Sequence, residues 1–460
     1  MKRLRWCGLV VVIALLSCSG GGSRTTTPVV SVVPSSASSL PSIPSPAPLT
    51  VATVIATPPP ATAALQPTML PPPTAFPPVT ATSRITGTLP AVALEVKIGE
   101  MLMVGIEGTT TTEDARHLIQ DLHVGNVVLL DRNVASPAQV LRLTQGLQAL
   151  ALSANGSGLL IGADQEGGTV QRLRPGFTVL PDATTVGAAR RPDLAQALGR
   201  MVGDELLAVG VNVDLAPVLD VNDNPNNPVI GPRAFGTTPD VVQTSGLAFA
   251  VGLHEAGVIA VGKHFPGHGS TGTDSHFALS IVPKDRQALE AVELPPFRLA
   301  AASGIDAMMV AHVAYPALDP SGLPATVSAP IISGVLRGDL GFAGVVMTDD
   351  MGMTGISELM TPEEGAVRAV LAGADMVLCA RLDLPGSCPA SFLERLRAGL
   401  LRAVLDGRIP MARIDEAVHR ITALKAGYRV GPASGSGLAQ VGSAVHKRVI
   451  SEVLSAAGHP

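Results

Sequence analysis

The sequence predicts an α/β protein built as a parallel (β/α)8 barrel of the TIM type. From about residue 97 onward, eight short apolar runs rich in β-branched residues alternate with longer amphipathic stretches. Strands that are nearly all apolar and are separated by helices are typical of a parallel sheet buried on both faces. Eight such units in roughly 330 residues match an eight-stranded barrel. A doubly wound open sheet is the alternative, but no Gly-x-Gly-x-x-Gly dinucleotide pattern follows the first run.

The expected elements alternate regularly along the chain. The pattern predicts strands at residues 101–105, 124–131, 158–164, 211–218, 258–264, 307–313, 344–349 and 374–380. It predicts helices at residues 136–151, 191–209, 238–256, 286–303 and 361–372, with 389–406 and 411–428 as closing helices. Several of these helices begin at Ser, Thr or Pro and end at Gly, as helices commonly do.

The composition favours one large folded unit. Of the 460 residues, 46% are hydrophobic and 15% are charged, which excludes a mostly disordered chain. The net charge of −5 and the lack of a basic stripe argue against a nucleic-acid partner, because such proteins carry an excess of Lys and Arg. Aromatic residues make up only 3%, so we expect a ligand site that relies on hydrogen bonds more than on stacking.

The N-terminus has the features of an export signal. Basic residues precede an apolar run at 9–16, which ends at Ser17-Cys18 and is too short to span a bilayer comfortably. This ending resembles the lipobox of bacterial lipoproteins, which implies a signal peptide over residues 1–18 and diacylation of Cys18. The resemblance therefore predicts an extracytoplasmic protein with a lipid anchor in the bacterial cell membrane. A plain secretory signal with a secreted product, or a retained anchor, is the alternative.

Three further regions follow the signal. Residues 19–92 are rich in Pro, Ser and Thr and predict a disordered tether, because such a segment cannot bury enough apolar surface to form a core. The barrel is expected over residues 93–430, and the Gly/Ser/Ala-rich tail at 431–460 has no clear signal. Cys379 and Cys388 form either a disulfide or two free thiols, since the sequence does not supply their geometry.

Polar residues stand at the ends of five of the predicted strands. Active sites of such barrels are built on the face where the carboxyl ends of the strands meet. We therefore expect these residues to converge on one mouth; they are Asp164, Asp220, Lys263-His264, His312 and Asp349-Asp350. For Asp220, a purely structural role is the alternative.

The most distinctive stretch is the sequence KHFPGHGSTGTDSH at residues 263–276. A strand would deliver Lys263 and His264 to the rim, and the glycine-rich loop ending in Asp-x-His would place a titratable pair over a bound ligand. The segment resembles the signature loop of the bacterial β-N-acetylglucosaminidases of glycoside hydrolase family 3. Five more motifs of that family follow its order across residues 95–428, at 163–168 with 170–173, 233–236, 312–319, 347–351 and 372–378.

The resemblance implies a retaining glycosidase whose catalytic domain is residues 93–430 and which needs neither a metal nor another cofactor. Asp349, the first aspartate of the Thr-Asp-Asp stretch, corresponds to the nucleophile, and His276, partnered by Asp274, corresponds to the acid/base catalyst. The ligands of the N-acetylglucosamine hydroxyls correspond to Asp164, Arg172, Arg233, Lys263 and His264. Departures from the family pattern lie outside these positions and concern the shape of the aglycone site; they are Thr169, Ser270 and residues 351–353.

These residue types suit the implied chemistry. Retaining hydrolysis needs a carboxylate that attacks the anomeric carbon and a second group that protonates the leaving oxygen and then activates water. An imidazole can take the second role when an anion beside it keeps it protonated at the right moment, and Asp274 can supply that anion. The resemblance thus predicts exo-hydrolysis of terminal non-reducing β-linked N-acetylglucosamine, with peptidoglycan fragments as the expected source.

Other interpretations stay open on the sequence. Phosphorolysis or cleavage of another β-glycoside would use the same residues, and a tethered sugar-binding lipoprotein would bind without turnover. A metal site is a further alternative, although the loop's proline and glycines prevent one helical face and no His-Glu-x-x-His pattern occurs; its ligands would be His264, His268, His276 and Asp274. Asp349-Asp350 could also be an exposed turn or a helix cap.

Overall fold

The computed structural model describes residues 93–380, 390–428 and 430–459 of the chain. The predicted signal peptide with Cys18 and the predicted tether at 19–92 therefore lie outside the described residues. None of the helices in the described part combines the length and the apolar character that a membrane span requires.

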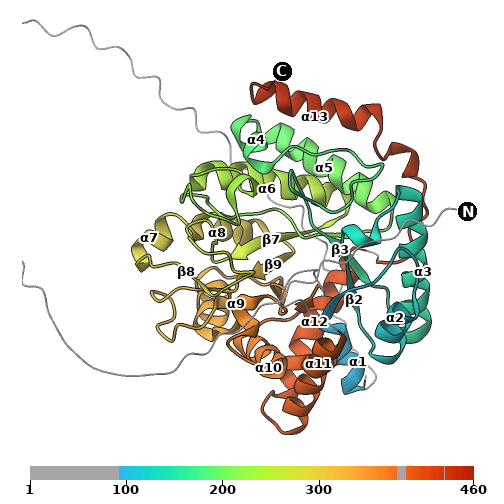
Figure 1. Cartoon of the computed structure of the whole chain (residues 1–460), viewed down its shortest axis with the longest axis vertical. Helices are drawn as coiled ribbons and strands as arrows, with labels where there is room; N and C mark the ends of the chain where they lie inside the picture. Colours follow the sequence, from blue (N-terminus) through green and yellow to red (C-terminus); the bar gives the residue numbers. More distant parts are fainter. Residues whose placement is uncertain (1–92, 381–389, 429, 460) are drawn as a thin grey trace, which may run out of the picture. The chain divides into compact units, whose positions relative to one another are not determined.

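Eight parallel strands form a closed barrel, as predicted (Figure 1). Strands that follow one another along the chain are neighbours in the sheet, and the last one pairs with the first. A parallel bridge between Met347 and Met376 joins the two edges of the sheet and closes the barrel. Every strand of the barrel overlaps its predicted range. The bounds are β1 Leu102–Gly105, β2 Asn126–Leu129, β3 Leu160–Ala163, β6 Val213–Asp214, β7 Ile259–Phe265, β9 Ala307–Val310, β11 Val345–Thr348 and β12 Val377–Cys379.

Helices surround the strands on the outside of the barrel (Figure 1). Those that were predicted are α3 Pro137–Asn155, α5 Pro192–Ala208, α6 Pro239–Ala256, α10 Pro362–Ala372, α11 Ala390–Leu405 and α12 Met411–Gly427. Their ends follow local chemistry, since Ser136 caps the first turn of α3 by accepting a hydrogen bond from the Gln139 backbone N–H, and α6 ends at Gly257 in the left-handed conformation.

The single helix predicted over residues 286–303 is wrong, because the structure has two helices there. They are α7 Arg286–Ala291 and α8 Leu294–Ser303. Pro295 and Pro296 stand in the first turn of α8, where the missing N–H groups would have no partner anyway. Within one continuous helix the same two prolines would each remove a hydrogen bond and clash with the preceding turn.

Several short elements were not predicted. The remaining helical segments are α1 Leu94–Glu100, α2 Glu113–Arg116, η1 His117–Asp121, η2 Asp131–Asn133, α4 Ala183–Ala188, η3 Gly231–Arg233, η4 Ala325–Val327, η5 Pro330–Asp339, α9 Thr354–Ser357, η6 Leu438–Gln440 and α13 Ala444–Ala456. Two small sheets lie beside the barrel, and they consist of β4 Gln165–Gly167 with β5 Val170–Gln171 and β8 Ser280–Ile281 with β10 Val313–Ala314.

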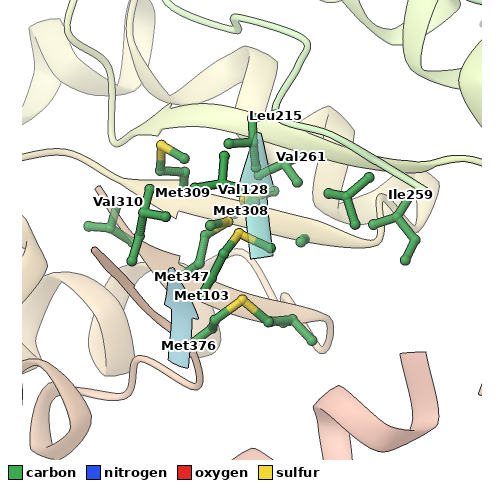
Figure 2. Packing of buried hydrophobic residues seen from close by; sticks show 14 of the residues in the cluster. Met103, Val128, Leu215, Ile259, Val261, Met308, Met309, Val310, Met347 and Met376 are labelled. Carbon is green, nitrogen blue, oxygen red and sulfur yellow. The ribbon is translucent and has the colours of Figure 1, made fainter. Parts of the chain in front are cut away.

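Methionine side chains contribute to the packing of the buried core. Figure 2 shows Met103, Met347 and Met376 close together, although they come from β1, β11 and the residue before β12. All three are buried. An unbranched thioether fills irregular gaps that branched side chains leave, so it suits the place where the barrel closes.

The tail after the barrel contains a helix that packs onto it. Glu205 is buried on α5, and its Oε1 accepts a hydrogen bond from the Gly442 backbone N–H. The same oxygen lies 2.8 Å from Nδ1 of His446 on α13. The same carboxylate accepts a bond from Thr178 Oγ1. Cys379 at the end of β12 is disulfide-bonded, whereas Cys388, its candidate partner, lies outside the described residues.

Candidate active site

The predicted nucleophile, Asp349, directly follows β11 and is half-buried. Its backbone N–H donates to the carbonyl of Val310 at 3.0 Å, which ties it to the end of the neighbouring strand β9. Burial alone would raise the pKa of Asp349, but three surrounding imidazoles outweigh that effect and lower the pKa to about 2; they belong to His264, His312 and His276. The carboxylate is therefore ionised at neutral pH, as a nucleophile must be.

Asp350, the second aspartate of the pair, has a different environment. Its side chain is fully enclosed, and its Oδ1 accepts hydrogen bonds from the backbone N–H groups of Gly352 and Ala380, both at 3.1 Å. Burial raises the pKa of Asp350 to about 6, although those two bonds act in the opposite direction. Asp350 thus connects the end of β11 with the end of β12, and the structure presents Asp349, not Asp350, at the barrel mouth.

His312 lies behind the nucleophile and is buried. Its Nε2 is 3.0 Å from the carbonyl oxygen of Asp350, which can only accept, so Nε2 carries a proton. Burial lowers the pKa of His312, and its Nδ1 lies 2.7 Å from the hydroxyl oxygen of Thr326. Through these two contacts His312 connects the turn after β11 with Thr326.

The predicted acid/base pair lies on the loop after β7. His276 Nδ1 is 2.7 Å from Asp274 Oδ1, and the same oxygen accepts a bond from the His276 backbone N–H at 2.8 Å. The two side chains are 28% and 26% exposed, so both reach solvent at the mouth. Because Nδ1 is engaged by Asp274, the Nε2 atom of His276 is the one that is free to exchange a proton with a ligand.

The loop with the acid/base pair is hydrogen-bonded to the segment that follows the nucleophile. The backbone N–H of Thr354 donates to the carbonyl of His276 at 3.3 Å, and that of Gly355 donates to the carbonyl of Ser275 at 3.1 Å. The Nε2 atom of His268 also forms a hydrogen bond with the hydroxyl of Ser275, at a distance of 2.8 Å. These contacts connect the predicted nucleophile and the predicted acid/base pair, and nothing in the sequence pattern signals them.

His268 has no part in the mouth itself. It is buried, its Nδ1 lies 2.8 Å from Thr271 Oγ1, and burial lowers its pKa to about 4. It is thus a neutral side chain that is satisfied inside the loop. Among the described residues no group of three or more His, Cys, Asp and Glu side chains is placed to hold a metal ion.

Four of the five predicted sugar ligands form one network of charges, together with a residue that sequence reasoning did not select. Lys263 Nζ lies 2.6 Å from Asp164 Oδ1 and 2.6 Å from Glu166 Oε1. Arg233 holds Glu166 through two hydrogen bonds of 2.8 Å, and Arg172 Nε lies 3.6 Å from Asp164 Oδ2. Glu166 is therefore the centre of the network.

The charge of Glu166 is kept by its two partners. Burial alone would raise the pKa of this carboxyl, but Arg233 and Lys263 lower it well below its usual range. A bidentate arginine and a buried lysine on one carboxylate leave little freedom to either cation. The signal that could have found Glu166 is its position two residues after Asp164, in the family motif at residues 163–168.

A hairpin returns the chain to Asp164. Strands β4 and β5 pair antiparallel, and the backbone N–H of Arg172 donates to the carbonyl of Asp164 at 3.0 Å. Gly167 has a φ of 100°, and a Cβ there would lie 2.3 Å from the carbonyl oxygen of Pro181. Only glycine fits this corner without strain. The adjacent glycines thus form the tight turn that brings Arg172 next to Asp164.

The fifth predicted sugar ligand, His264, is oriented by Asp220. Its Nδ1 lies 2.7 Å from Asp220 Oδ2, which leaves Nε2 facing Arg233 Nη2 at 3.5 Å. Asp220 Oδ1 also accepts bonds from the backbone N–H groups of His264 and His268. Burial alone would raise the pKa of Asp220, but His264 more than offsets this and the pKa is lowered. Asp220 therefore has the structural role that was one of its two expected roles.

A second carboxyl that the sequence did not single out lies beneath the network. Asp214 on β6 is fully buried, and its Oδ1 accepts a bond from the Gln165 backbone N–H at 3.0 Å. Its Oδ2 has no hydrogen-bond partner. Burial raises the pKa of Asp214 to about 8, with Asp164 and Glu166 adding to the rise against Lys263. Asp214 is therefore an uncharged carboxylic acid at neutral pH.

Comparison with known proteins identifies the family. Residues 93–424 match the glycosyl hydrolase family 3 N terminal domain. A β-hexosaminidase of Alkalilimnicola ehrlichii is 45% identical over 336 residues, which is 70% of this chain and 92% of the relative.

Solved structures agree with this similarity. A family 3 β-N-acetylglucosaminidase from Paenibacillus sp. str. FPU-7 is 43% identical with a TM-score of 0.75, covering 80% of this chain and 69% of its own. The Neisseria gonorrhoeae NagZ, in complex with N-trifluoroacetyl-D-glucosamine, is 30% identical with a TM-score of 0.65, covering 78% and 98%. The resemblance seen in the sequence motifs is confirmed, and the chain belongs to glycosyl hydrolase family 3 and is a glycoside hydrolase.

Proposed function

We propose that this chain is an exo-acting, retaining β-N-acetylglucosaminidase that hydrolyses terminal non-reducing β-linked N-acetylglucosamine. One observation carries the proposal: an ionised carboxylate, Asp349, lies within the electrostatic reach of a His276–Asp274 pair whose loop is bonded to the segment after Asp349. A nucleophile and a proton carrier held in one frame are the two groups that retaining hydrolysis requires.

The first step forms a covalent intermediate. The Asp349 carboxylate attacks the anomeric carbon, and the bond from that carbon to the glycosidic oxygen breaks. His276 gives its Nε2 proton to the departing oxygen, so the aglycone leaves as an alcohol. Asp274, 2.7 Å from Nδ1, keeps the ring oriented and stabilises the charged imidazolium before the transfer.

The second step releases the sugar. The now neutral Nε2 of His276 takes a proton from water as the water oxygen attacks the anomeric carbon, and the ester bond to Asp349 breaks. Two displacements on the same carbon return the β configuration. The proton that His276 gave to the aglycone is thereby replaced, and both catalytic groups regain their starting states.

The network around Glu166 is suited to holding the sugar. Lys263, Arg233 and Arg172 offer charged donors, and Asp164 offers a charged acceptor, at a mouth that needs to bind several hydroxyls. Because the cations are already fixed by Glu166 and Asp164, binding would cost little further ordering. We assign these residues, with His264, to the non-reducing terminal sugar.

The test is turnover of a panel of 4-nitrophenyl β-glycosides, followed by product analysis. We expect preference for the N-acetylglucosaminide, and proton NMR should show β-N-acetylglucosamine as the first product. Running the reaction with and without inorganic phosphate separates hydrolysis from phosphorolysis, because phosphorolysis would yield the sugar 1-phosphate. Absence of turnover with retained sugar binding would instead support a binding protein without catalysis.

The site of action forms a second part of the proposal. The export signal and the lipobox-like Leu15-Leu16-Ser17-Cys18 support a lipid anchor at Cys18 and action on peptidoglycan fragments outside the cytoplasm. Cys18→Ser should abolish acylation and release the enzyme from the membrane fraction. Wild-type enzyme with an unmodified Cys18, found free in the medium, would contradict this part and leave the catalytic proposal unaffected.

A further inference from the structure

Phe277 is an aromatic side chain placed beside the acid/base residue and open to solvent. It is 56% exposed, whereas every other Phe and Tyr in the described part of the chain is buried or half-buried. We infer that Phe277 forms the apolar wall of the aglycone site, against which a ring of the leaving group stacks, and that this ring is a sugar. The inference rests on the proposed function and names the class of its leaving group.

The role of His276 determines which part of the substrate lies near Phe277. The two ring centroids are 6.5 Å apart and the ring planes are inclined by 51°. A proton donor must come within about 3 Å of the oxygen it protonates. That oxygen is bonded directly to the first carbon of the aglycone, so the aglycone occupies the space next to the His276 ring. Phe277 borders this space.

The backbone holds Phe277 at this place. Its N–H donates to the carbonyl of Asp274 at 3.1 Å, as does the N–H of Ala278. The preceding residue, His276, is itself bonded through its carbonyl to Thr354. The aromatic ring is therefore attached to the same rigid frame as the acid/base pair, and little ordering is needed when a ligand covers it.

The chemistry of the surroundings favours a sugar ring over other leaving groups. A β-linked pyranose has an apolar face of C–H groups and a rim of hydroxyls. Phe277 supplies an apolar surface, and the Asp274 carboxylate three residues before it, 26% exposed, supplies an acceptor at the same mouth. An aromatic ring beside polar groups is the usual arrangement where one side of a ligand is apolar and its edge is polar.

The inference also modifies the expectation drawn from composition. The pocket for the terminal sugar is lined by charged side chains, in agreement with the scarcity of aromatics. On the leaving-group side, however, stacking is available from one well-placed ring. The two halves of the substrate would thus be recognised by different physical interactions, the first by hydrogen bonds and the second by contact with Phe277.

The experiment compares Phe277→Ala and Phe277→Trp with the wild type on two substrates. One is the β-1,4-linked N-acetylglucosamine disaccharide, and the other is methyl β-N-acetylglucosaminide, whose aglycone has no ring. We expect Phe277→Ala to lower kcat/KM for the disaccharide by roughly tenfold, mainly through KM, and to change that for the methyl glycoside less than about twofold. Phe277→Trp should restore the disaccharide value.

Two controls keep the result specific. Val445→Ala removes a side chain of similar exposure, 53%, on α13 and should leave both substrates unchanged. The inhibition constant of the product N-acetylglucosamine should be the same in wild type and Phe277→Ala, because that sugar occupies the other half of the site.

Three outcomes would overturn the arguments; two of them concern Phe277 and the third concerns the proposed function. An equal loss on both substrates would show that Phe277 positions His276, and an unchanged disaccharide value would show that the ring does not touch the aglycone; either overturns this inference. Wild-type enzyme that releases N-acetylglucosamine from neither substrate would overturn the proposed function itself.

Discussion

Asp214→Asn is expected to stabilise the protein relative to the wild type, and the gain should be larger at neutral pH than in mild acid. The side chain is fully buried, and burial raises its pKa from 3.8 to about 8. In the folded state the group is therefore neutral below about pH 8, whereas in the unfolded chain it is ionised above about pH 4. Asparagine reproduces the shape of the neutral acid and cannot ionise.

The size of the effect follows from proton linkage. A carboxyl whose pKa is raised on folding contributes stability that is fully present below its unfolded pKa and is lost as the pH rises through its folded pKa. Between pH 4 and 8 the folded protein keeps a proton at Asp214 that the unfolded chain has released. The free energy of unfolding then falls by up to about 1.4 kcal/mol per pH unit, or about 3 kcal/mol from pH 5 to 7.

The assay is chemical denaturation of wild type and variant at pH 5 and at pH 7. The difference in unfolding free energy between Asp214→Asn and wild type should shift by about 3 kcal/mol in favour of the variant on going from pH 5 to 7. Asp350, whose pKa is also raised, titrates in both proteins and cancels. Asp204→Asn, at an exposed position on α5, is the matched control and should show no such shift. An equal difference at both pH values for Asp214→Asn would refute the reasoning.

Three further predictions follow from the contacts described above. Asp349→Ala should reduce turnover by roughly four orders of magnitude without unfolding the protein, as measured with 4-nitrophenyl N-acetylglucosaminide; a variant at Asp350 that lost activity while Asp349→Ala kept it would reverse the assignment. His276→Ala should slow disaccharide cleavage by roughly 10²- to 10⁴-fold but slow the pre-steady-state burst of 4-nitrophenol much less, because that leaving group needs little protonation; equal losses would place the proton donor elsewhere. Glu205→Ala should lower the free energy of unfolding by roughly 3 kcal/mol, since Thr178 and His446 lose a shared buried acceptor. Hydrogen exchange should then show earlier opening of α13 than in the wild type, and unchanged exchange there would argue against this contact.

The sequence alone predicted the strands of the barrel and several of the polar residues that stand at their carboxyl ends. Each strand is a short apolar run between polar segments, a pattern that involves only neighbours along the chain. Strands such as β7 and β11 could therefore be located without knowing the fold. Asp349 and Lys263 stand at the ends of such runs, and the carboxyl ends of parallel strands meet at one face. The family resemblance then supplied the roles of Asp349 and His276, whose activities remain predictions.

Pairings between distant segments could not be predicted in this way. Glu166 meets Arg233 across 67 residues, and Thr354 meets His276 although the strands β9 and β11 lie between them in the chain. Such contacts exist only after the barrel closes and brings separate strand ends together, and no local period encodes them. The break between α7 and α8 was missed for a different reason, since two prolines were read within a helix instead of at its start.

The strand positions were thus determined by the sequence itself through local hydrophobic periodicity, and the family motifs pointed to the predicted catalytic side chains. Only the tertiary structure decided their electrostatic states. Asp349 directly follows β11 and Asp214 lies on β6, and both are aspartates. Yet the pKa of the first falls to about 2 and that of the second rises to about 8. The difference arises because the imidazoles outweigh the effect of burial at the first, whereas burial, with Asp164 and Glu166 adding to it, dominates at the second. A residue's neighbours in space are fixed only by the folded chain.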